Sequence, residues 1–252
     1  MKHIHTSKRL TVLCLILCLS YSCTKETAAT VPATGADRQS SERINAATNA
    51  LTTLTLQPGP ADGQDAFVEV YAGDATYVTK NFNSVPELPV SAWTASGQEF
   101  IQRVYLKFTG LSAIPPAAVI ISARLSLYGL NPNTSVTHHE GNSTYSGSVY
   151  DGENTCIITA ITGSDWQANA ITWSNKPQGY KGIDIIPASA SQWNYNVSVN
   201  VTDLVKNMVG AGSNNYGFGI ALKNEKIYRT ILFASSEATD STKRPRLVIT
   251  YQ

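Results

Sequence analysis

Apolar and polar residues alternate with a period of two along several segments of this 252-residue chain. A strand points successive side chains to opposite sides, so this alternation is typical of strands with one buried face. An amphipathic helix would instead repeat its apolar residues every ~3.6 positions. The pattern therefore predicts half-buried strands at FIQRVYLKF (100–108), IISARLSLYG (120–129), YNVSVNV (195–201), YGFGIALK (216–223) and RPRLVITY (244–251).

Clusters of Gly, Pro, Asn and Ser separate these segments and favour turns. Only two places favour a short helix. These are SDWQAN (164–169), where Ser164 can cap, and TDLVKNMVGAG (202–212), where Thr202 can cap. Many short strands with so little helix predict an all-β fold, a two-sheet antiparallel β-sandwich of jelly-roll type with one or two short helices.

The N-terminus has the features of an export signal. Lys2, Lys8 and Arg9 are followed by the apolar run LTVLCLILCL (10–19). That run is about half of the roughly 20 residues that a membrane-spanning helix needs. It therefore predicts a secretory signal and not a transmembrane helix.

The residue that follows this signal suggests a lipid anchor. Cys23 lies directly after LSYS and resembles the lipobox of bacterial lipoproteins, although Tyr21 departs from the strictest form of that motif. We expect residues 1–22 to be a lipoprotein signal peptide and Cys23 to carry the lipid. The alternative is an ordinary cleaved signal with a chance cysteine. The anchor would place the protein in the cell envelope, at the outer membrane of a Gram-negative, Bacteroidetes-type bacterium.

Two parts follow the signal. Residues 23–50 are rich in Thr, Ala and Ser and predict a flexible tether, whereas residues 51–252 suit one large β domain. Cys156 is the only cysteine of that domain, so we expect no disulfide within it. Without the three basic residues of the signal, 16 basic and 18 acidic residues remain, a formal charge of −2. That charge indicates no nucleic-acid partner, and we expect a monomer.

Five pieces of the domain occur in the order found in a known family. They are Asp65-Ala66-Phe67-Val68, RVYLKFTGLSAIPPAAVIISARLSLYG (103–129), Trp166 with ITWSNKP (171–177), VNVTDLV with NNYGFGIAL, and FASSE with RPRLVITY. Together they span nearly everything from Asp65 to Tyr251. The domain thus resembles the DNRLRE domain of disaggregatase-related proteins, some of whose members are classed as family 96 carbohydrate-binding modules. The resemblance implies a sandwich that binds polysaccharide.

Trp166 and Trp173 can be interpreted either as a stacking platform for a ligand or as packing anchors of the fold. In the resembled family the W…TW.N.P segment recurs as a fold signature. Thr172 and Asn175 suit a turn, while Trp173 can bury a large ring. We therefore expect both tryptophans to pack against the fold.

The domain is poorly supplied with catalytic groups. Its only histidines are His138 and His139, which we expect to be a solvated loop pair because no cysteine or further histidine is near enough in sequence to complete a metal site. The Gln-x-His motif of jelly-roll polysaccharide lyases, paired carboxylates on one strand and a Gly-x-Ser-x-Gly elbow are all absent from the sequence. We expect a protein without catalytic activity and without a cofactor.

Binding groups are better supplied, on the polar side of two predicted strands. Arg103, Tyr105 and Lys107 alternate with apolar residues in the first strand, and Arg124 and Tyr128 do so in the next. If the two strands pair, cations and phenol rings share one solvent-facing surface. Sugars suit such a surface, because rings stack on C–H patches and arginine binds carboxylates or hydroxyls. The alternative is that these side chains are only solvated and bind nothing. For Arg103 there is a second alternative, that it ties down a loop.

Aromatic residues in predicted loops are further candidate contacts for a glycan. They are Trp93, Tyr145 and Trp193, each among small polar residues. The alternative is that these rings cap the edge of the sandwich. Asp62 and Asp65 are candidate ligands for a structural calcium ion, although Asp65 can equally cap a turn.

These features favour a non-catalytic, lipid-anchored cell-envelope protein that binds a polysaccharide, with an acidic, uronate-containing polymer as the specific hypothesis. An alternative of another class is a structural or adhesive sandwich that binds protein partners. A third is a lyase or hydrolase whose site the sequence does not reveal.

The anchor hypothesis gives a direct prediction. Cys23→Ala should release the protein from the membrane fraction and abolish lipid labelling, because the thiol that accepts the lipid is lost. Cell fractionation with metabolic lipid labelling measures both effects. The released protein should remain folded and soluble, and continued retention in membranes would show that Cys23 is not the attachment point.

Overall fold

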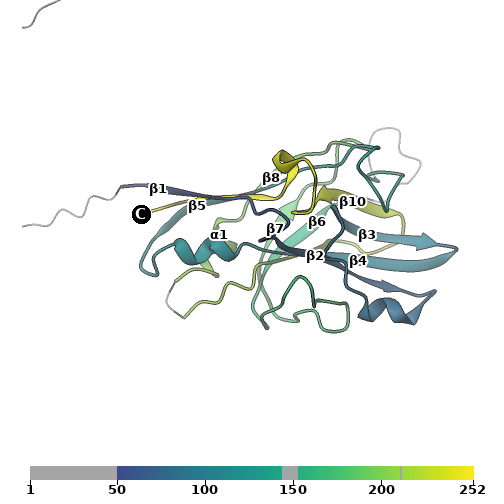
Figure 1. The fold of residues 1–252 in the computed structure, drawn as a ribbon, viewed down its shortest axis with the longest axis horizontal. Helices are drawn as coiled ribbons and strands as arrows, with labels where there is room; N and C mark the ends of the chain where they lie inside the picture. The colour runs from purple at the N-terminus through teal and green to yellow at the C-terminus, as the bar shows by residue number, and fades with distance from the viewer. Residues whose placement is uncertain (1–49, 144–152, 211) are drawn as a thin grey trace, which may run out of the picture. The chain divides into compact units, whose positions relative to one another are not determined.

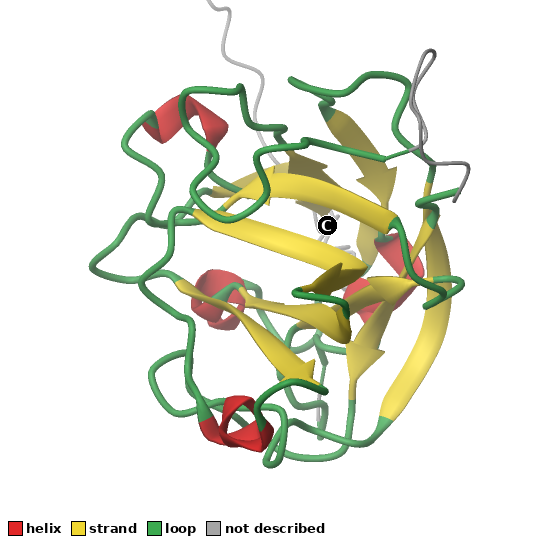
Figure 2. Ribbon diagram, turned by 90° about the vertical axis from the view of Figure 1, so that its right-hand side faces the viewer, coloured by secondary structure: helices red, strands yellow, loops and turns green. Residues whose placement is uncertain are grey.

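The computed structural model describes residues 50–143, 153–210 and 212–252. The predicted signal peptide, Cys23 and nearly all of the predicted tether lie outside these residues, as does Tyr145. The described strands form two antiparallel sheets. Figure 2 shows that the helices are only short segments in the connections between strands.

The first sheet has four strands in the order β1-β11-β5-β8. Their bounds are Thr52–Leu56 for β1, Arg246–Tyr251 for β11, Ile120–Leu127 for β5 and Val197–Asn200 for β8. On β5 and β11 the buried Ala123, Leu125, Leu247 and Ile249 alternate with more exposed residues. This is the half-buried pattern that the sequence predicts for these strands.

The second sheet has seven strands in the order β10-β3-β4-β9-β6-β7, with β2 paired to β4. Figure 1 shows β3 and β4 as neighbouring long strands. The bounds are Arg229–Ala234 (β10), Glu87–Ala95 (β3), Gln98–Lys107 (β4), Phe218–Leu222 (β9), Cys156–Ile161 (β6), Tyr180–Ile186 (β7) and Gln64–Tyr71 (β2).

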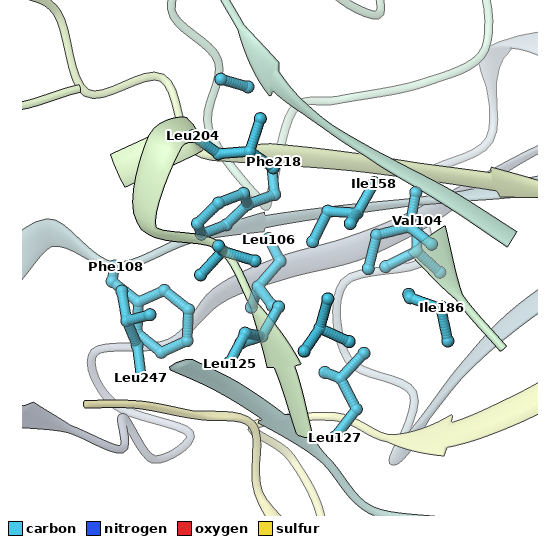
Figure 3. Close-up of a cluster of buried hydrophobic side chains, with 14 of the residues drawn as sticks. Val104, Leu106, Phe108, Leu125, Leu127, Ile158, Ile186, Leu204, Phe218 and Leu247 are labelled. Atoms are coloured by element: carbon cyan, nitrogen blue, oxygen red, sulfur yellow. The ribbon is translucent and has the colours of Figure 1, made fainter. Parts of the chain in front are cut away.

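The core between the sheets is apolar and almost free of solvent contact. Figure 3 shows residues from both sheets meeting there, with Leu106 and Phe218 on one side and Leu125 and Leu247 on the other. All four are at most 1% exposed. Cys156 is also in this core as a free thiol, and burial raises its pKa. The prediction of an all-β, two-sheet antiparallel sandwich is confirmed.

Helix is confined to four short segments of the described chain. One is the α-helix α1, Thr202–Lys206, and three are 3₁₀ helices: η1 (Ala75–Thr79), η2 (Thr109–Ala113) and η3 (Ser241–Lys243). The helix predicted in 202–212 is present but ends at Lys206, and Thr202 does not cap it. Its hydroxyl accepts from the backbone N–H of Ala123 and donates to Asn200, and Val201 is the N-cap residue. None of the described helices is both long and apolar enough to cross a membrane.

The helix predicted at 164–169 is wrong, because those residues form turns and irregular backbone. Two of their backbone groups bond to side chains of the seven-stranded sheet. The carbonyl of Trp166 accepts from Lys107, and the N–H of Ala168 donates to Gln64. These contacts tie the segment to β4 and β2.

Candidate functional site

A groove lies over the seven-stranded sheet, where strands β4, β9, β6 and β7 run side by side. Its volume is about 570 Å³. The lining residues come from these four strands and from the connection between β9 and β10: Arg103, Tyr105, Ile157, Thr159, Tyr180, Gly182, Ile183, Gly219, Ile220, Ala221, Leu222, Lys223 and Glu225. It is a concave, largely apolar surface with a few polar groups, as in many binding sites.

Small side chains form the floor of the groove. Gly219 pairs with Tyr105 of β4 on one side and with Thr159 of β6 on the other, and Ala221 pairs with Ile157. A Cβ atom added at Gly219 would lie only 3.2 Å from the ring of Tyr180. Because Gly219 has no side chain, the ring of Tyr180 can lie directly over it.

Tyr180 forms one wall, at the start of the edge strand β7. It is 43% exposed, while its hydroxyl lies 3.0 Å from that of Tyr105 and donates to the carbonyl of Pro177. Tyr105 itself is only 1% exposed, and its burial, followed by the contact with Tyr180, raises its pKa. The phenol of Tyr105 therefore stays neutral, and its contact with Tyr180 holds the ring of Tyr180 beside the groove.

An ion pair lies at one end of the groove. Arg103 donates two hydrogen bonds to Glu225, of 2.7 and 2.8 Å, a bidentate arrangement that raises the pKa of Arg103. The guanidinium also lies over the ring of Trp173, 4.9 Å from its centre, and the ammonium of Lys176 lies 4.1 Å from the same centre. Arg103 thus joins the loop that carries Glu225 to the segment that carries Trp173. This agrees with the alternative in which Arg103 ties down a loop.

Lys107 is not on a solvent-facing surface, contrary to the sequence-based expectation. Its side chain is 6% exposed, and its ammonium donates to Asp165 at 2.8 Å and to the carbonyl of Trp166 at 2.6 Å. The hydrogen bond from Lys107 lowers the pKa of Asp165. The strand alternation was correct, but the residues 162–179 cover this part of the sheet.

We call residues 162–179, which connect β6 to β7, the tryptophan segment. Its Trp166, Ala168 and Ile171 form a second apolar cluster with Tyr105 of β4 and with Ala66 and Val68 of β2. The indole of Trp166 donates to the carbonyl of Tyr216 at 2.7 Å and meets the Tyr105 ring edge to face at 5.9 Å. Trp166 is 6% exposed and Trp173 is partly buried, so both tryptophans pack against the fold as expected.

Arg124 and Tyr128 do not share a surface with Arg103. Strand β5 belongs to the four-stranded sheet and pairs with β11 and β8, whereas β4 belongs to the other sheet. The two predicted strands do not pair, so the condition for one shared surface of cations and phenol rings is not met. Arg124 is exposed and donates to the hydroxyl and carbonyl of Ser198, and Tyr128, just beyond β5, is half-buried.

The other two described aromatic candidates pack against the protein. Trp93 is in strand β3 and not in a loop, and it meets Tyr228 edge to face at 5.4 Å. Trp193 is in a loop, as expected, but packs on a small apolar cluster that includes Leu130 and Ala238. Neither lines the groove on β4, β9, β6 and β7.

His138 is buried, so the expectation of a solvated histidine pair holds only for the exposed His139. The hydroxyl of Thr137 lies 2.6 Å from Nδ1 of His138 and also hydrogen-bonds to Glu87. Burial lowers the pKa of His138, although nearby Glu87 opposes this. The buried carboxylate of Glu87 also accepts from the backbone of Val136, so it holds the loop against β3.

The two aspartates considered for calcium each have protein donors. Asp62 accepts from the N–H of Gly59, and the buried Asp65 accepts from the N–H and hydroxyl of Ser236. Burial raises the pKa of Asp65, and the bonds from Ser236 oppose that rise. Asp65 thus joins β2 to the chain that follows β10, which corresponds to its alternative role as a cap. Within the described ranges no three Asp, Glu, His or Cys side chains cluster as metal ligands.

Several groove residues were not identified from the sequence. They are Tyr180, Gly219, Ala221, Lys223 and Glu225. A signal existed in YGFGIALK, where glycine and alanine occupy the polar side of an alternating strand and indicate a shallow surface. Tyr180 and Glu225 had no such signal, because the pairing of β7 with β6 brings in Tyr180 and the connection between β9 and β10 brings in Glu225.

The chain is thus a β-sandwich with a groove on one sheet. The model of carbohydrate-binding module family 96 matches residues 61–251, which include all eleven strands except β1. The chain belongs to this family. A search of the curated proteins finds no match.

The burial of Lys107 predicts a structural role. Lys107→Ala should lower the free energy of unfolding by about 1–3 kcal/mol, because the carbonyl of Trp166 loses its donor in a buried position. It should leave carbohydrate affinity unchanged. Thermal denaturation and a binding isotherm measure the two quantities.

Lys206→Ala is the matched control. Lys206 pairs with Asp203 at 3.0 Å, but both side chains are more than half exposed, so little stability should be lost. If Lys107→Ala has normal stability but binds glycan more weakly, the structural role is wrong and Lys107 contacts the ligand.

Proposed function

We propose that this chain is a non-catalytic, lipid-anchored protein of the cell envelope that binds an extended, uronate-containing polysaccharide in the groove on β4, β9, β6 and β7. The observation that carries the proposal is this groove in a member of a carbohydrate-binding family. The anchor rests on Cys23 and the signal that precedes it.

The shape and chemistry of the groove suit a sugar chain. The exposed ring of Tyr180 offers a face on which the C–H patch of a pyranose can stack. Ala221 lets the chain approach the sheet closely beside this ring, and Ile183, 66% exposed, extends the apolar surface along β7. A polymer can lie across the strands without entering a closed cavity.

Charge supports an acidic polymer. Arg103 is satisfied by Glu225, so their charges balance. Lys223 also lines the groove, is exposed, and has no carboxylate partner within the described part of the chain. Its ammonium is therefore available to a uronate carboxylate.

The arrangement of carboxylates supports binding without hydrolysis. Among the described residues that line the groove, Glu225 is the only acid, and both of its oxygens accept from Arg103. Hydrolysis by paired carboxylates needs a second acid across the scissile bond, at about 5–9.5 Å.

One observation favours the alternative of an adhesive module that binds a protein partner. Ile183 and Ile185 of the edge strand β7 are 66% and 45% exposed. Exposed apolar side chains on an edge strand are a common protein contact. The first experiment below separates the two functions.

Filling the groove should abolish glycan binding. Ala221→Phe places a ring over the floor, and its side chain points away from the core, so the fold should survive. Affinity gel electrophoresis in alginate should show at least about a tenfold loss of affinity, equal to ~1.4 kcal/mol.

Val248→Phe on the outer side of the four-stranded sheet is the matched control and should bind normally. If Ala221→Phe binds the polymer as the unmodified protein does, the groove is not the site. If the unmodified protein binds no glycan but retains a protein partner through Ile183, the adhesive function is correct.

Lys223 should confer the preference for acidic polymers. Lys223→Gln should weaken alginate binding about fivefold, through loss of a charge-assisted hydrogen bond, and leave binding of a neutral β-glucan unchanged. Raising the salt concentration should weaken alginate binding to the unmodified protein more than to the variant. Equal salt dependence for both proteins would contradict the role of Lys223, and calorimetry at two salt concentrations provides the comparison.

A further inference from the structure

A second, smaller pocket lies where three loops meet at β10. They are the loop after β5, the loop before β8 and the connection from β10 to η3. Its volume is about 240 Å³, and it shares no lining residue with the groove. The lining residues are Pro86, Gly129, Leu130, Asn131, Asn133, Thr134, Asn194, Ala234, Ala238, Thr239, Asp240 and Lys243.

The floor of this pocket is apolar and well packed. Leu130, Ala234 and Ala238 are at most 7% exposed and form one cluster, against which Trp193 packs. The floor is therefore rigid and does not depend on a ligand for its shape.

The rim is held in place by its own hydrogen bonds. Asn131 accepts from the N–H of Asn133 at 2.8 Å, and Asp240 accepts from the N–H and hydroxyl of Thr242 at 2.9 and 2.6 Å. The N–H of Asn194 donates to the carbonyl of Leu130 at 2.7 Å. These bonds fix the backbone of all three loops around the opening.

Four polar side chains on this fixed rim are open to a ligand, although Lys243 also interacts electrostatically with Asp240. Asn133, Asn194, Thr239 and Lys243 line the pocket, and none of their side chains makes a hydrogen bond to another described residue. The two amides and the hydroxyl can both donate to and accept from a ligand, and the ammonium can donate. Asn194 also has a φ of +56°, a conformation uncommon outside glycine, which places an amide here at a small backbone cost.

We propose that this pocket is a second carbohydrate subsite that takes a single sugar ring, such as the end unit of a chain. Pockets for drug-sized ligands start at about 300 Å³, so this one suits a smaller ligand. Amides that both donate and accept match the neighbouring hydroxyls of a sugar, and the apolar floor matches its C–H face. The inference rests on the proposed carbohydrate-binding function but uses a separate site.

The test is ¹H–¹⁵N NMR of the purified chain titrated with D-glucose, D-galactose, D-mannose and D-glucuronate. At least one of these sugars should shift the amide signals of Asn133, Asn194 and Thr239, with millimolar affinity. Asn194→Gly removes the amide side chain, and glycine adopts the same φ without strain. It should weaken that affinity about fivefold, the effect of one lost hydrogen bond.

Ser96→Gly is the matched control, because Ser96 has a φ of +50° in the exposed turn between β3 and β4. It should bind as the unmodified protein does. The proposal is overturned if none of the four sugars shifts the pocket signals, or if Asn194→Gly binds with unchanged affinity.

The same spectra separate this inference from the proposed function. Shifts confined to Tyr180, Gly219 and Lys223 would support the groove and overturn the pocket. Shifts confined to the pocket would support the subsite and count against the groove.

Discussion

The seven-stranded sheet is buried on both of its faces at strand β4, and most of the molecule's organisation depends on this. One face of β4 packs against the four-stranded sheet through Val104 and Leu106. The other face packs against the tryptophan segment through Tyr105 and Lys107. A sheet that had only one covered face would leave a broad flat surface. The second layer reduces that surface to a bounded groove, with Tyr180 at its edge.

The two-layer core followed directly from the sequence, because alternation in segments such as 120–129 and 244–251 identifies which side chains face inward. Alternation does not say what lies over the other side. Tyr105 and Lys107 occupy polar positions in the pattern and are nevertheless buried, since a distant segment supplies an acceptor and an apolar cover. The sequence predicts a loop at Trp93, although it lies in β3, because β3 is buried along most of its length and shows no polar alternation.

The candidate site was only partly predictable for a related reason. Arg103 and Tyr105 were identified because they share a strand with clear alternation. Tyr180 and Glu225 approach them across 75 and 122 residues of sequence. The local pattern of a strand carries little information about which other strand it pairs with. Strands β4 and β5, for example, are consecutive in sequence but belong to different sheets. The short side chains of β9 are the one local feature from which the groove follows.

The bidentate bond between Arg103 and Glu225 has a consequence for recognition itself. It fastens the connection between β9 and β10 to the sheet before any ligand arrives, and the stacking of Arg103 on Trp173 extends that restraint to the tryptophan segment. Walls that are already immobile lose little conformational entropy when a partner is captured. For the proposed function, this means that the groove is preorganised and that nearly all of the ordering cost of binding falls on the polysaccharide.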